Sequence, residues 1–500
     1  MREAVARMVA ILLRLFFRRV EVTGLENVPA EGGGIVVSWH PNGLIDPALI
    51  FGTTPRPIVF GARHGLFRWP LLGAILRAVG TVPIYRAQDD RRGDLESRRR
   101  ANEQSLDALA GRVAAGGYAC LFPEGDSHDG SQLLDLKTGV ARFYYRARQL
   151  GERPPAIVPV GLHYDAKRLF RSSVLVAFHP PITLDAELDV TPSEGEPAEA
   201  SRARCHALTH RIDEVLREAV HATESWDIHH LMHRARKLVR AERAAQAGAA
   251  PGAPSMAERT RGLARVWKGY YARLEDAPLE VHALRERLRE YDADLRALGL
   301  EDHELDRPPG IVSPWLAILL ALQVVLVYLL LPPILWFGYI VNAPPVLVLW
   351  ALTRAGARKH KDEATIKVLA GSILFPLTWL LAGLAAGLTH SAVHAQYPTI
   401  PDTFVTAGLL TALLSFVGGA VALRYLRIAR ETLRAVRVRL TRERRRLTIA
   451  RLLVERGELF EAVTGMGEGV ALPGRVAADG TIQASLRPVE PAGAARAAGS

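Results

Sequence analysis

Cysteine is nearly absent from this chain of 500 residues, which contains only Cys120 and Cys205. Two cysteines cannot build the disulfide framework of a small secreted domain, so we expect the soluble part to lie in a reducing, cytoplasmic setting. Zinc-ligand spacings are missing too, and basic residues are not interleaved with aromatic residues, which argues against nucleic acid as a partner. The surplus of basic residues, a formal net charge of +11, therefore indicates anionic lipid or a phosphorylated substrate.

Charged residues are missing from three long stretches of the C-terminal half. Residues 308–353, 368–389 and 403–423 contain no Lys, Arg, Asp or Glu. A helix that crosses a bilayer needs about 20 apolar residues. The first stretch is long enough for two such helices, and the pair Pro332-Pro333 near its middle predicts a break between them. We therefore predict about four transmembrane helices in two hairpins over residues 311–424; core helices of a soluble protein are the alternative.

The apolar stretch at the N-terminus is too short to cross a bilayer. It runs from residue 5 to residue 17 and is interrupted by Arg7 and Arg14, which share a helical face with Arg18. This pattern predicts an amphipathic helix over residues 1–19 that lies in the membrane interface. The alternative is an amphipathic helix packed on its own domain. A small-residue cleavage site is missing, so we do not expect a signal peptide.

Residues 20–185 alternate between two kinds of pattern. Apolar, β-branched runs such as "GGGIVVSWH" and "AIVPVGLHY" are separated by stretches with helical periodicity. This alternation predicts an α/β domain in which helices cover a mixed sheet on both faces. Beyond it we expect four segments: a charged helical region over 186–310 with a linker near 244–256, the membrane region over 311–424, a basic cytoplasmic helix over 425–471 and a disordered tail over 472–500.

The stretch "SWHPNGLIDP" combines a histidine and an aspartate around a turn. Asp46 followed by Pro47 is a common helix start, which would explain Asp46 without any chemistry. His40, however, stands where a strand ends, and a carboxylate a few residues on can orient such a histidine as a general base. On this stretch alone, both interpretations remain open.

Three other stretches place polar residues at strand ends, where α/β sheets carry their chemistry. "VGTVPIYR" ends in Arg86, which is either part of a solvated charged turn or positioned to bind a phosphate. "LFPEGDSHDGSQLLDLKTGVAR" leads from a strand to a helix N-terminus, where glycines and backbone N–H groups suit anions. Its adjacent Ser127, His128 and Asp129 lack a G-x-S-x-G elbow, which argues against a serine hydrolase. The last stretch, "AIVPVGLHY" with Pro159, also fits a plain core strand.

A histidine pair in the charged helical region could suggest a metal. His229 and His233 lie four residues apart, on one face of a predicted helix. No acidic third ligand is evident, so we predict no metal site.

In their order along the chain, these stretches resemble the glycerolipid acyltransferase superfamily. The usual signature there is N-H-x4-D, whereas this chain has five residues between His40 and Asp46 and Trp39 in place of the asparagine. That departure is similar to the fungal-type glycerol-3-phosphate/dihydroxyacetone-phosphate acyltransferases, whose "PH-x-N-Q-x-x-DP" stands here as "WHPNGLIDP" with glycine for glutamine. The resemblance covers about residues 10–430 and is specific for the superfamily, but much less so for the substrate.

The resemblance implies acyl transfer from a thioester, acyl-CoA or acyl carrier protein, to a glycerol hydroxyl at a lipid bilayer. His40 would take the hydroxyl proton and Asp46 would orient His40, while Pro159 would shape the acyl or donor side. No metal, no covalent intermediate and no cofactor beyond the donor itself are implied.

Six further positions follow from the same family pattern. Arg86, Glu124 and Gly125 would shape the pocket for the acceptor phosphate. Phe122-Pro123 belongs to the same motif and would form its walls. Lys137 would make a second phosphate contact.

The acceptor itself stays open at this point. Our first choice is transfer to the sn-1 hydroxyl of glycerol-3-phosphate in phospholipid biosynthesis. The alternative is the same chemistry on lysophosphatidic acid or another lysophospholipid. A degenerate, non-catalytic membrane protein and a hydrolase are less favoured, because the motif residues are intact and because no hydrolase motif accompanies them.

The distribution of Lys and Arg predicts the orientation in the membrane. The loop at 354–361 and the segment after residue 423 are rich in Lys and Arg, whereas residues 390–402 contain neither. Since positive loops stay in the cytoplasm, we expect an integral membrane protein with the catalytic domain on the cytoplasmic face, in the inner membrane if the source is bacterial.

We predict that a topology reporter inserted within residues 390–402 reads as external. The same reporter inserted within residues 354–361 serves as the matched control and should read as cytoplasmic. A cytoplasmic signal from the first position would contradict the predicted orientation.

Overall fold

The computed structural model describes residues 2–85, 95–193, 195–249, 252–306, 314–356 and 363–484. The chain divides into two compact units, one formed by Met1–Trp226 with Gly356–Val368 and the other by Asp227–Ala355 with Leu369–Ser500. Each unit has its own hydrophobic core.

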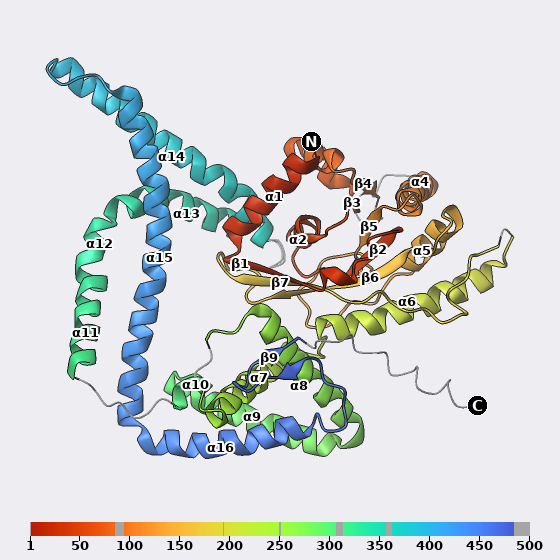
Figure 1. The fold of residues 1–500 in the computed structure, drawn as a ribbon. Helices are drawn as coiled ribbons and strands as arrows, with labels where there is room; N and C mark the ends of the chain where they lie inside the picture. Colours follow the sequence, from red (N-terminus) through yellow and green to blue (C-terminus); the bar gives the residue numbers. More distant parts are fainter. Residues whose placement is uncertain are drawn as a thin grey trace. The chain divides into compact units, whose positions relative to one another are not determined.

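A seven-stranded sheet of order β1-β7-β6-β2-β5-β3-β4 forms the centre of the first unit (Figure 1). Its strands are β1 (Arg19–Thr23), β2 (Gly34–Ser38), β3 (Ile58–Arg63), β4 (Val82–Ile84), β5 (Tyr118–Leu121), β6 (Ala156–Tyr164) and β7 (Ser173–Phe178). Strands β2 to β6 run parallel, whereas β7 is antiparallel to β6 and carries β1 parallel to itself. The predicted mixed sheet is confirmed, and the C-terminal ends of β2, β5, β3 and β4 meet at one edge.

Helices cover both faces of this sheet, as the apolar strands require. On one face, Ile35 and Val37 pack with α4 (Leu95–Ala114), α5 (Gly139–Leu150) and α6 (Ala198–Val220). On the other face, Val36 packs with α1 (Arg2–Phe16) and α2 (Ile45–Thr53). Each fully buried Val or Ile stabilises the fold by roughly 1.5–3 kcal/mol, so strands apolar on both sides are fixed in the sheet's centre. The shorter elements are η1 (Leu25–Asn27), η2 (His64–Arg68) and α3 (Pro70–Ala78).

The N-terminal helix α1 combines the two alternatives drawn from its sequence. Leu13 and Phe16 are buried in the core of the first unit. Met8, Ile11 and Leu15, spaced by three and four residues, remain exposed as an apolar stripe. The helix therefore packs on its own domain and still presents an apolar stripe that suits a membrane interface.

The second unit contains a helical bundle and a short hairpin. The helices are α7 (Trp226–Gln246), α8 (Met256–Asp276), α9 (Pro278–Leu298), α10 (Asp302–Leu305) and α16 (Arg446–Gly465), and the hairpin is β8 (Arg475–Val476) with β9 (Ile482–Gln483). Arg265 of α8 donates to the carbonyls of Pro473 and Gly474 at 3.2 and 3.1 Å, which ties the hairpin segment to that helix. Residues 472–484 are thus folded, which corrects the disorder predicted for them; residues 485–500 lie outside the described residues. The chemical reason is that α8 supplies arginine donors to the carbonyls of an Ala- and Gly-rich segment that has little apolar surface of its own.

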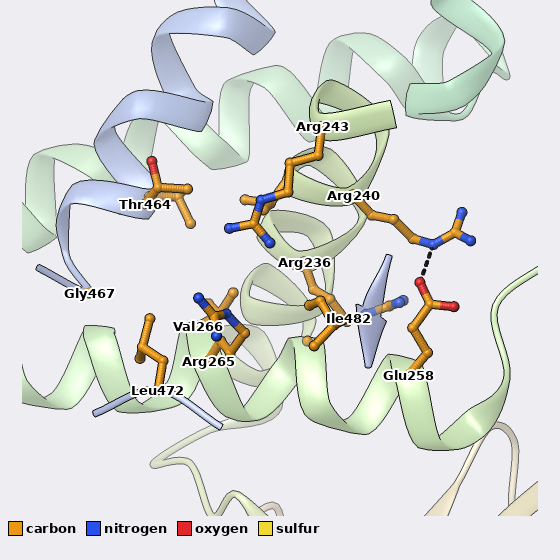
Figure 2. Close-up of a pocket in the computed structure, with 13 residues that line it drawn as sticks. Arg236, Arg240, Arg243, Glu258, Arg265, Val266, Thr464, Gly467, Leu472 and Ile482 are labelled. Atoms are coloured by element: carbon orange, nitrogen blue, oxygen red, sulfur yellow. Dashed lines mark hydrogen bonds and ion pairs between the residues drawn. The ribbon is translucent and has the colours of Figure 1, made fainter. Parts of the chain in front are cut away.

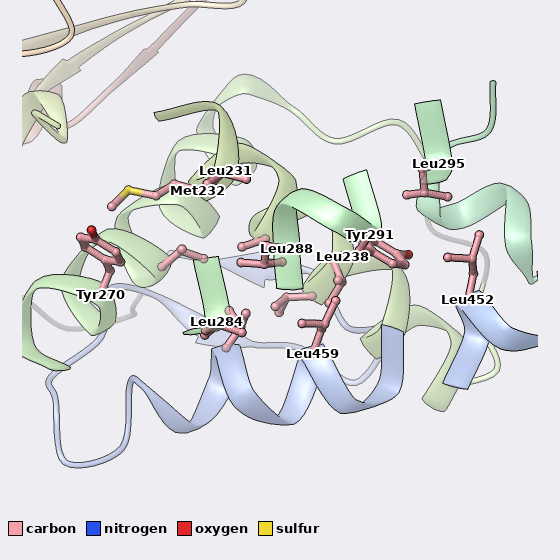
Figure 3. Packing of buried hydrophobic residues seen from close by; sticks show 14 of the residues in the cluster. Leu231, Met232, Leu238, Tyr270, Leu284, Leu288, Tyr291, Leu295, Leu452 and Leu459 are labelled. Atoms are coloured by element: carbon pink, nitrogen blue, oxygen red, sulfur yellow. The ribbon is translucent and has the colours of Figure 1, made fainter. Parts of the chain in front are cut away.

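Apolar side chains from all five of these helices contribute to the bundle core (Figure 3). Leu238, Tyr291, Leu295, Leu452 and Leu459 are all fully buried there. The packing joins α16, at the C-terminal side of the membrane helices, to α7 and α9 from before them. Residues 186–310, predicted as one helical region, therefore divide: α6 covers the sheet of the first unit, and α7 to α10 belong to the second. The predicted linker falls in the break between α7 and α8.

The apolar C-terminal half forms α11 (Pro314–Val325), a π-helical turn η3 (Leu326–Leu330), α12 (Leu331–Ile334), α13 (Trp336–Gly356), α14 (Glu363–Gln396) and α15 (Phe404–Arg444). Among the described residues, three helices are long and apolar enough to cross a membrane: Trp336–Gly356, Glu363–Gln396 and Phe404–Arg442. A shorter apolar helical segment covers Ala321–Leu330. The basic segment expected after residue 424 continues α15 without a break up to Arg444.

The structure differs from the predicted first hairpin at Pro332-Pro333. The chain stays helical through both prolines, and α13 turns away from α12 at Leu335 rather than folding back along α11 (Figure 1). The π-helical turn directly precedes the prolines, so their missing N–H groups fall in the first turn of a new helical segment, where proline is tolerated. The second predicted hairpin is present, as α14 and α15 joined by residues 397–403.

Small residues bring the apolar helices of the second unit close together. A Cβ atom on Gly338 would lie 2.8 Å from the carbonyl oxygen of Gly418, and one on Gly383 would lie 2.5 Å from that of Gly408. Asn342 donates to the carbonyl of Ser415 at 3.0 Å and accepts from Trp379 Nε1 at 3.0 Å. Such small-residue contacts and interhelical hydrogen bonds are typical of helices that associate in lipid.

Candidate functional site

His40 and Asp46 form a hydrogen-bonded pair at the C-terminal end of β2. The His40 Nδ1 atom lies 2.8 Å from Asp46 Oδ2, and the Asp46 side chain is fully buried. Because a carboxylate only accepts, Nδ1 carries the proton and the lone pair is on Nε2. The His40 side chain keeps 16% exposure, so the imidazole is open on one side.

The structure excludes the interpretation of Asp46 as the N-cap of the following helix. Helix α2 begins at Ile45, and Leu44 precedes it, so Asp46 is not the N-cap. Its carboxylate instead accepts from the backbone N–H of Asn42 at 2.6 Å and from the hydroxyl of Tyr164. Gly43 allows the chain to turn so that Asp46 comes back to His40, since the φ of Gly43, 48°, lies in the left-handed region that favours glycine.

Tyr164 is the third donor to the buried carboxylate. Burial, and next the charge of Asp46, hold the pKa of the Tyr164 hydroxyl well above its ordinary value. The hydroxyl therefore stays protonated and donates to Asp46 Oδ1. Three donors satisfy the carboxylate where no water reaches it, as a buried charge requires.

Neighbouring segments fix the backbone of the histidine turn. Ser38 Oγ donates to the carbonyl of Val160 at 2.8 Å, and Trp39 Nε1 donates to that of Leu162 at 3.0 Å. Lys167 Nζ donates to the carbonyl of Pro41 at 3.0 Å. Strand β6 and the segment after it thus hold the turn before and after His40.

The turn after β5 holds His40 from the other side. The ring of Phe122 stacks on the imidazole, with 4.1 Å between centroids and 16° between planes. Glu124 Oε2 accepts the backbone N–H of His40 at 2.9 Å, and the carbonyl of His40 accepts from His128 N at 3.0 Å. Phe122 and Glu124 therefore position the histidine.

Glu124 also connects the turn after β5 to the loop that follows it. Its side chain is fully buried, and its other oxygen accepts from Leu134 N at 3.2 Å and from His128 Nε2 at 2.7 Å. His128 Nδ1 in turn accepts from Gly130 N at 3.0 Å, so this imidazole is neutral and structural. Glu124 thus holds two loops of the site together, and its implied part in the acceptor pocket stays a prediction.

Gly125 and Lys137 lie together beyond this turn. Gly125 has a φ of 70°, and a Cβ atom on it would be 2.7 Å from Lys137 Nζ. The backbone N–H of Lys137 donates to the carbonyl of Pro123 at 2.9 Å. Among the residues described, no carboxylate pairs with Lys137, which directly precedes the N-terminus of α5. A free ammonium beside a helix N-terminus suits an anion.

Two other predicted residues are placed less directly. Arg86 lies outside the described residues; Tyr85, just before it, stacks on His64 at 4.4 Å between centroids and is held by Asn102, which bonds both its N–H and its carbonyl at 2.8 Å. Pro159 is buried within β6, beside Val37 of β2. Its implied role on the donor side stays a prediction.

The site contains an acid–base pair and a free cation but no candidate metal centre within the described residues. His229 and His233, noted for their spacing, lie 3.1 Å apart between Nε2 atoms, and burial lowers the pKa of His229 to about 4. Three positions that the sequence did not single out, Asn42, Tyr164 and Lys167, hold the histidine turn. Tyr164 ends the quoted strand "AIVPVGLHY", so its place at a strand end was the available signal.

Comparison with known proteins finds acyltransferases that are similar to part of the first unit. Residues 19–163 match the model of the family described as Acyltransferase. Glycerol-3-phosphate O-acyltransferase 2 of Saccharomyces cerevisiae is 27% identical over 206 residues, which are 41% of this chain and 26% of the yeast protein. Lyso-ornithine lipid O-acyltransferases are similar as well: that of Rhizobium meliloti is 25% identical over 41% of this chain and 69% of its own length, and that of Rhodobacter capsulatus 33% identical over 28% and 44%.

These relatives overlap with the chain only in part. The match spans about a quarter of the yeast protein, and the family model covers residues 19–163 of this chain. A crystal structure of a 1-acyl-sn-glycerophosphate acyltransferase from Thermotoga maritima covers 43% of this chain and 79% of its own, at 19% identity and a TM-score of 0.29. The fold assignment therefore rests on the sheet described above.

We predict that neither native thiol reacts with a soluble disulfide reagent at pH 8, and that both react once the protein is unfolded. Burial raises the pKa of the Cys120 thiol well above its ordinary value, with Asp46 adding to it, and burial also raises that of Cys205. A raised pKa keeps each thiol protonated, and the thiolate is the reactive form. Titration of thiols before and after denaturation measures this, and a thiol that reacts at once in the native protein would contradict the burial of β5 or α6.

Proposed function

Starting from the acyltransferase-family domain at residues 19–163, we propose that this protein is a membrane-bound O-acyltransferase that moves a fatty acyl group from a thioester donor to glycerol-3-phosphate. The observation that carries the proposal is the His40–Asp46 pair, whose Nε2 atom is free to accept a proton. The unpaired Lys137 beside Gly125 supports a phosphorylated acceptor.

The chemistry follows from the hydrogen bonds of His40. The acceptor hydroxyl gives its proton to His40 Nε2 as its oxygen attacks the thioester carbonyl, and the Asp46 carboxylate stabilises the imidazolium that forms. Collapse of the tetrahedral intermediate breaks the carbon–sulfur bond, and the imidazolium proton passes to the departing thiolate. One ester is formed for one thioester consumed. General base catalysis of this kind contributes about 10²–10⁴-fold to the rate.

The acceptor has one well-supported alternative. Lyso-ornithine lipid acyltransferases are similar to this chain over part of its length. A lysolipid acceptor, such as lysophosphatidic acid, also presents a hydroxyl group that His40 could deprotonate. Lys137 favours a phosphate-bearing acceptor over a zwitterionic one. Acyl-CoA and acyl carrier protein are both suitable donors, because the site needs only the thioester carbonyl.

The membrane part fits a lipid product. Three long apolar helices anchor the chain, and the exposed stripe of Met8, Ile11 and Leu15 on α1 presents apolar surface from the catalytic unit itself. We propose that the catalytic unit acts on the cytoplasmic face, where thioester donors and glycerol-3-phosphate are available, and the reporter insertions described above test that orientation.

The test is acyl transfer by membranes that contain the protein, with labelled acyl-CoA and glycerol-3-phosphate, dihydroxyacetone phosphate or lysophosphatidic acid offered in parallel. His40→Ala should lower kcat at least about 100-fold, while His210→Ala, at an exposed position of α6, should leave it unchanged. Product from glycerol-3-phosphate supports the first choice, and product from lysophosphatidic acid alone supports the alternative. Fatty acid release without any acceptor would identify a hydrolase, and near-normal activity of His40→Ala would overturn the assignment of the general base.

We further predict that Lys137→Ala raises KM for the phosphorylated acceptor by about tenfold or more, since a hydrogen bond to a charged group contributes roughly 1.5–3 kcal/mol. The value of kcat should change little, because Lys137 does not contact His40. Lys137→Arg should restore most of the affinity. Arg146→Ala, which removes an exposed cation on α5, is the matched control, and an unchanged KM in Lys137→Ala would remove this residue from the acceptor site.

A further inference from the structure

A cavity rich in arginine lies in the second unit, apart from the residues of the proposed chemistry. It has a volume of about 140 Å³ and is bounded by α7, α8, the end of α16 and the hairpin segment (Figure 2). Arg236, Arg240 and Arg243 follow one face of α7 at spacings of four and three residues, and Arg265 comes from α8. Glu258 is the one acidic residue among those that line it.

The single carboxylate is already used by one of these arginines. Glu258 Oε1 accepts from Arg240 Nε at 2.7 Å. Among the residues that the structure describes, no carboxylate pairs with Arg243 or Arg265. Arg265 donates only to the carbonyls of Pro473 and Gly474, and Arg243 faces the ring of Phe460 at 6.0 Å. Two cationic groups thus share a partly enclosed space without a counter-charge.

The charged forms of Arg243 and Arg265 are both destabilised in this cavity. Burial lowers the pKa of Arg243 and of Arg265, and the charge of Arg265 lowers that of Arg243 further. Like charges held together in a partly buried site destabilise each other unless an anion lies between them.

Buried arginines elsewhere in the same unit follow the opposite pattern. Arg234 pairs with Asp292 and with Asp302, the latter at 2.8 Å. Arg456 is 2% exposed and pairs with Glu242 and Asp306. These two arginines are thus neutralised by carboxylates of the bundle itself, whereas within the described residues Arg243 and Arg265 have no such partner.

The ligand class follows from the donors and the space. Two guanidinium groups form planar forks that match phosphate oxygens, which is why arginine is preferred for phosphate. The cavity is smaller than the roughly 300–1,000 Å³ of sites for drug-sized ligands, so it suits a phosphoryl group with a small substituent. Val266, Leu472 and Ile482 complete the wall and provide apolar contact for such a substituent.

We propose that Arg243 and Arg265 bind the phosphoryl group of an anionic ligand in this cavity, at a site separate from the catalytic pair. The phosphoryl group is carried either by a soluble phosphate ester or by the headgroup of an anionic phospholipid. Binding replaces the missing counter-charge and joins α7 and α8 to the hairpin segment, whose carbonyls Arg265 already holds. The ligand therefore orders this side of the helical bundle.

A thiol placed at the cavity reports binding locally. Thr464 lines the cavity, and both native cysteines are buried, so Thr464→Cys in the full-length protein supplies an accessible thiol next to the arginines. The protein is held in nanodiscs of phosphatidylcholine at constant ionic strength, and the rate of alkylation by N-ethylmaleimide is measured. Inorganic phosphate, glycerol-3-phosphate, and nanodiscs that contain phosphatidic acid are compared with chloride alone.

We expect a phosphate-bearing ligand to slow alkylation several-fold, and Arg243→Gln to raise the ligand concentration needed at least about tenfold. Arg243→Lys should retain part of the protection. The matched control is Arg273→Gln, an exposed arginine of α8 that pairs with Glu280. Acyl transfer by the Thr464→Cys protein checks that it is folded, and it does not depend on this site.

Comparing these ligands distinguishes a soluble phosphate ester from a lipid headgroup as the source of the phosphoryl group. Protection by inorganic phosphate or glycerol-3-phosphate supports a soluble ester, and protection only in nanodiscs with phosphatidic acid supports a lipid headgroup. The proposal is overturned if no arm slows alkylation, or if Arg243→Gln is protected as well as the parent protein.

Discussion

The buried carboxylate of Asp46 is the constraint on which the candidate site depends. It is removed from water completely, so each of its oxygens needs a donor, and the available donors are His40, the backbone of Asn42 and Tyr164. These come from a strand end, a turn and a second strand. Satisfying one charge therefore fixes the direction of the imidazole, the path of the turn and the end of β6 together.

A second buried carboxylate, Glu124, holds the backbone of His40, just as Asp46 holds its side chain. Because β2 and β5 are neighbours in the sheet, the turns that follow them leave the same edge, and Glu124 can accept the N–H of His40 across the gap. Its other oxygen joins His128 and Leu134 of the following loop. The loop that carries Lys137 is thereby positioned by the same carboxylate that positions His40, so the two side chains of the candidate site are held by one group.

Most features that the sequence could predict follow from local patterns, and the others depend on contacts between residues far apart in the chain. The alternation of apolar strands and helices predicted the covered sheet, and the order of the motifs predicted that His40, Asp46 and Glu124 belong to one site, where the structure brings them into contact. The position of Tyr164 could not be predicted, because its contact with Asp46 bridges strands far apart in the chain. The disorder predicted for residues 472–484 was wrong because their composition says nothing of the donors that α8 offers, and the hairpin predicted at Pro332-Pro333 was wrong because a preceding π-helical turn accommodates both prolines.

The start of α14 links the histidine turn to the membrane part through a short chain of contacts. Lys167 donates to the carbonyl of Pro41, next to His40, and the carbonyl of Arg168 accepts from Lys367 Nζ at 2.8 Å. Ala364, in the first turn of the same helix, is fully buried in the core beside α1 and α2. Residues 363–368 thus belong to the first unit, while the helix they begin continues as one of the three long apolar helices. Under the proposed function, the lipid substrate would react at the boundary between bilayer and water. Residues 363–368 would then join the histidine turn to the start of a helix that is long and apolar enough to cross a bilayer.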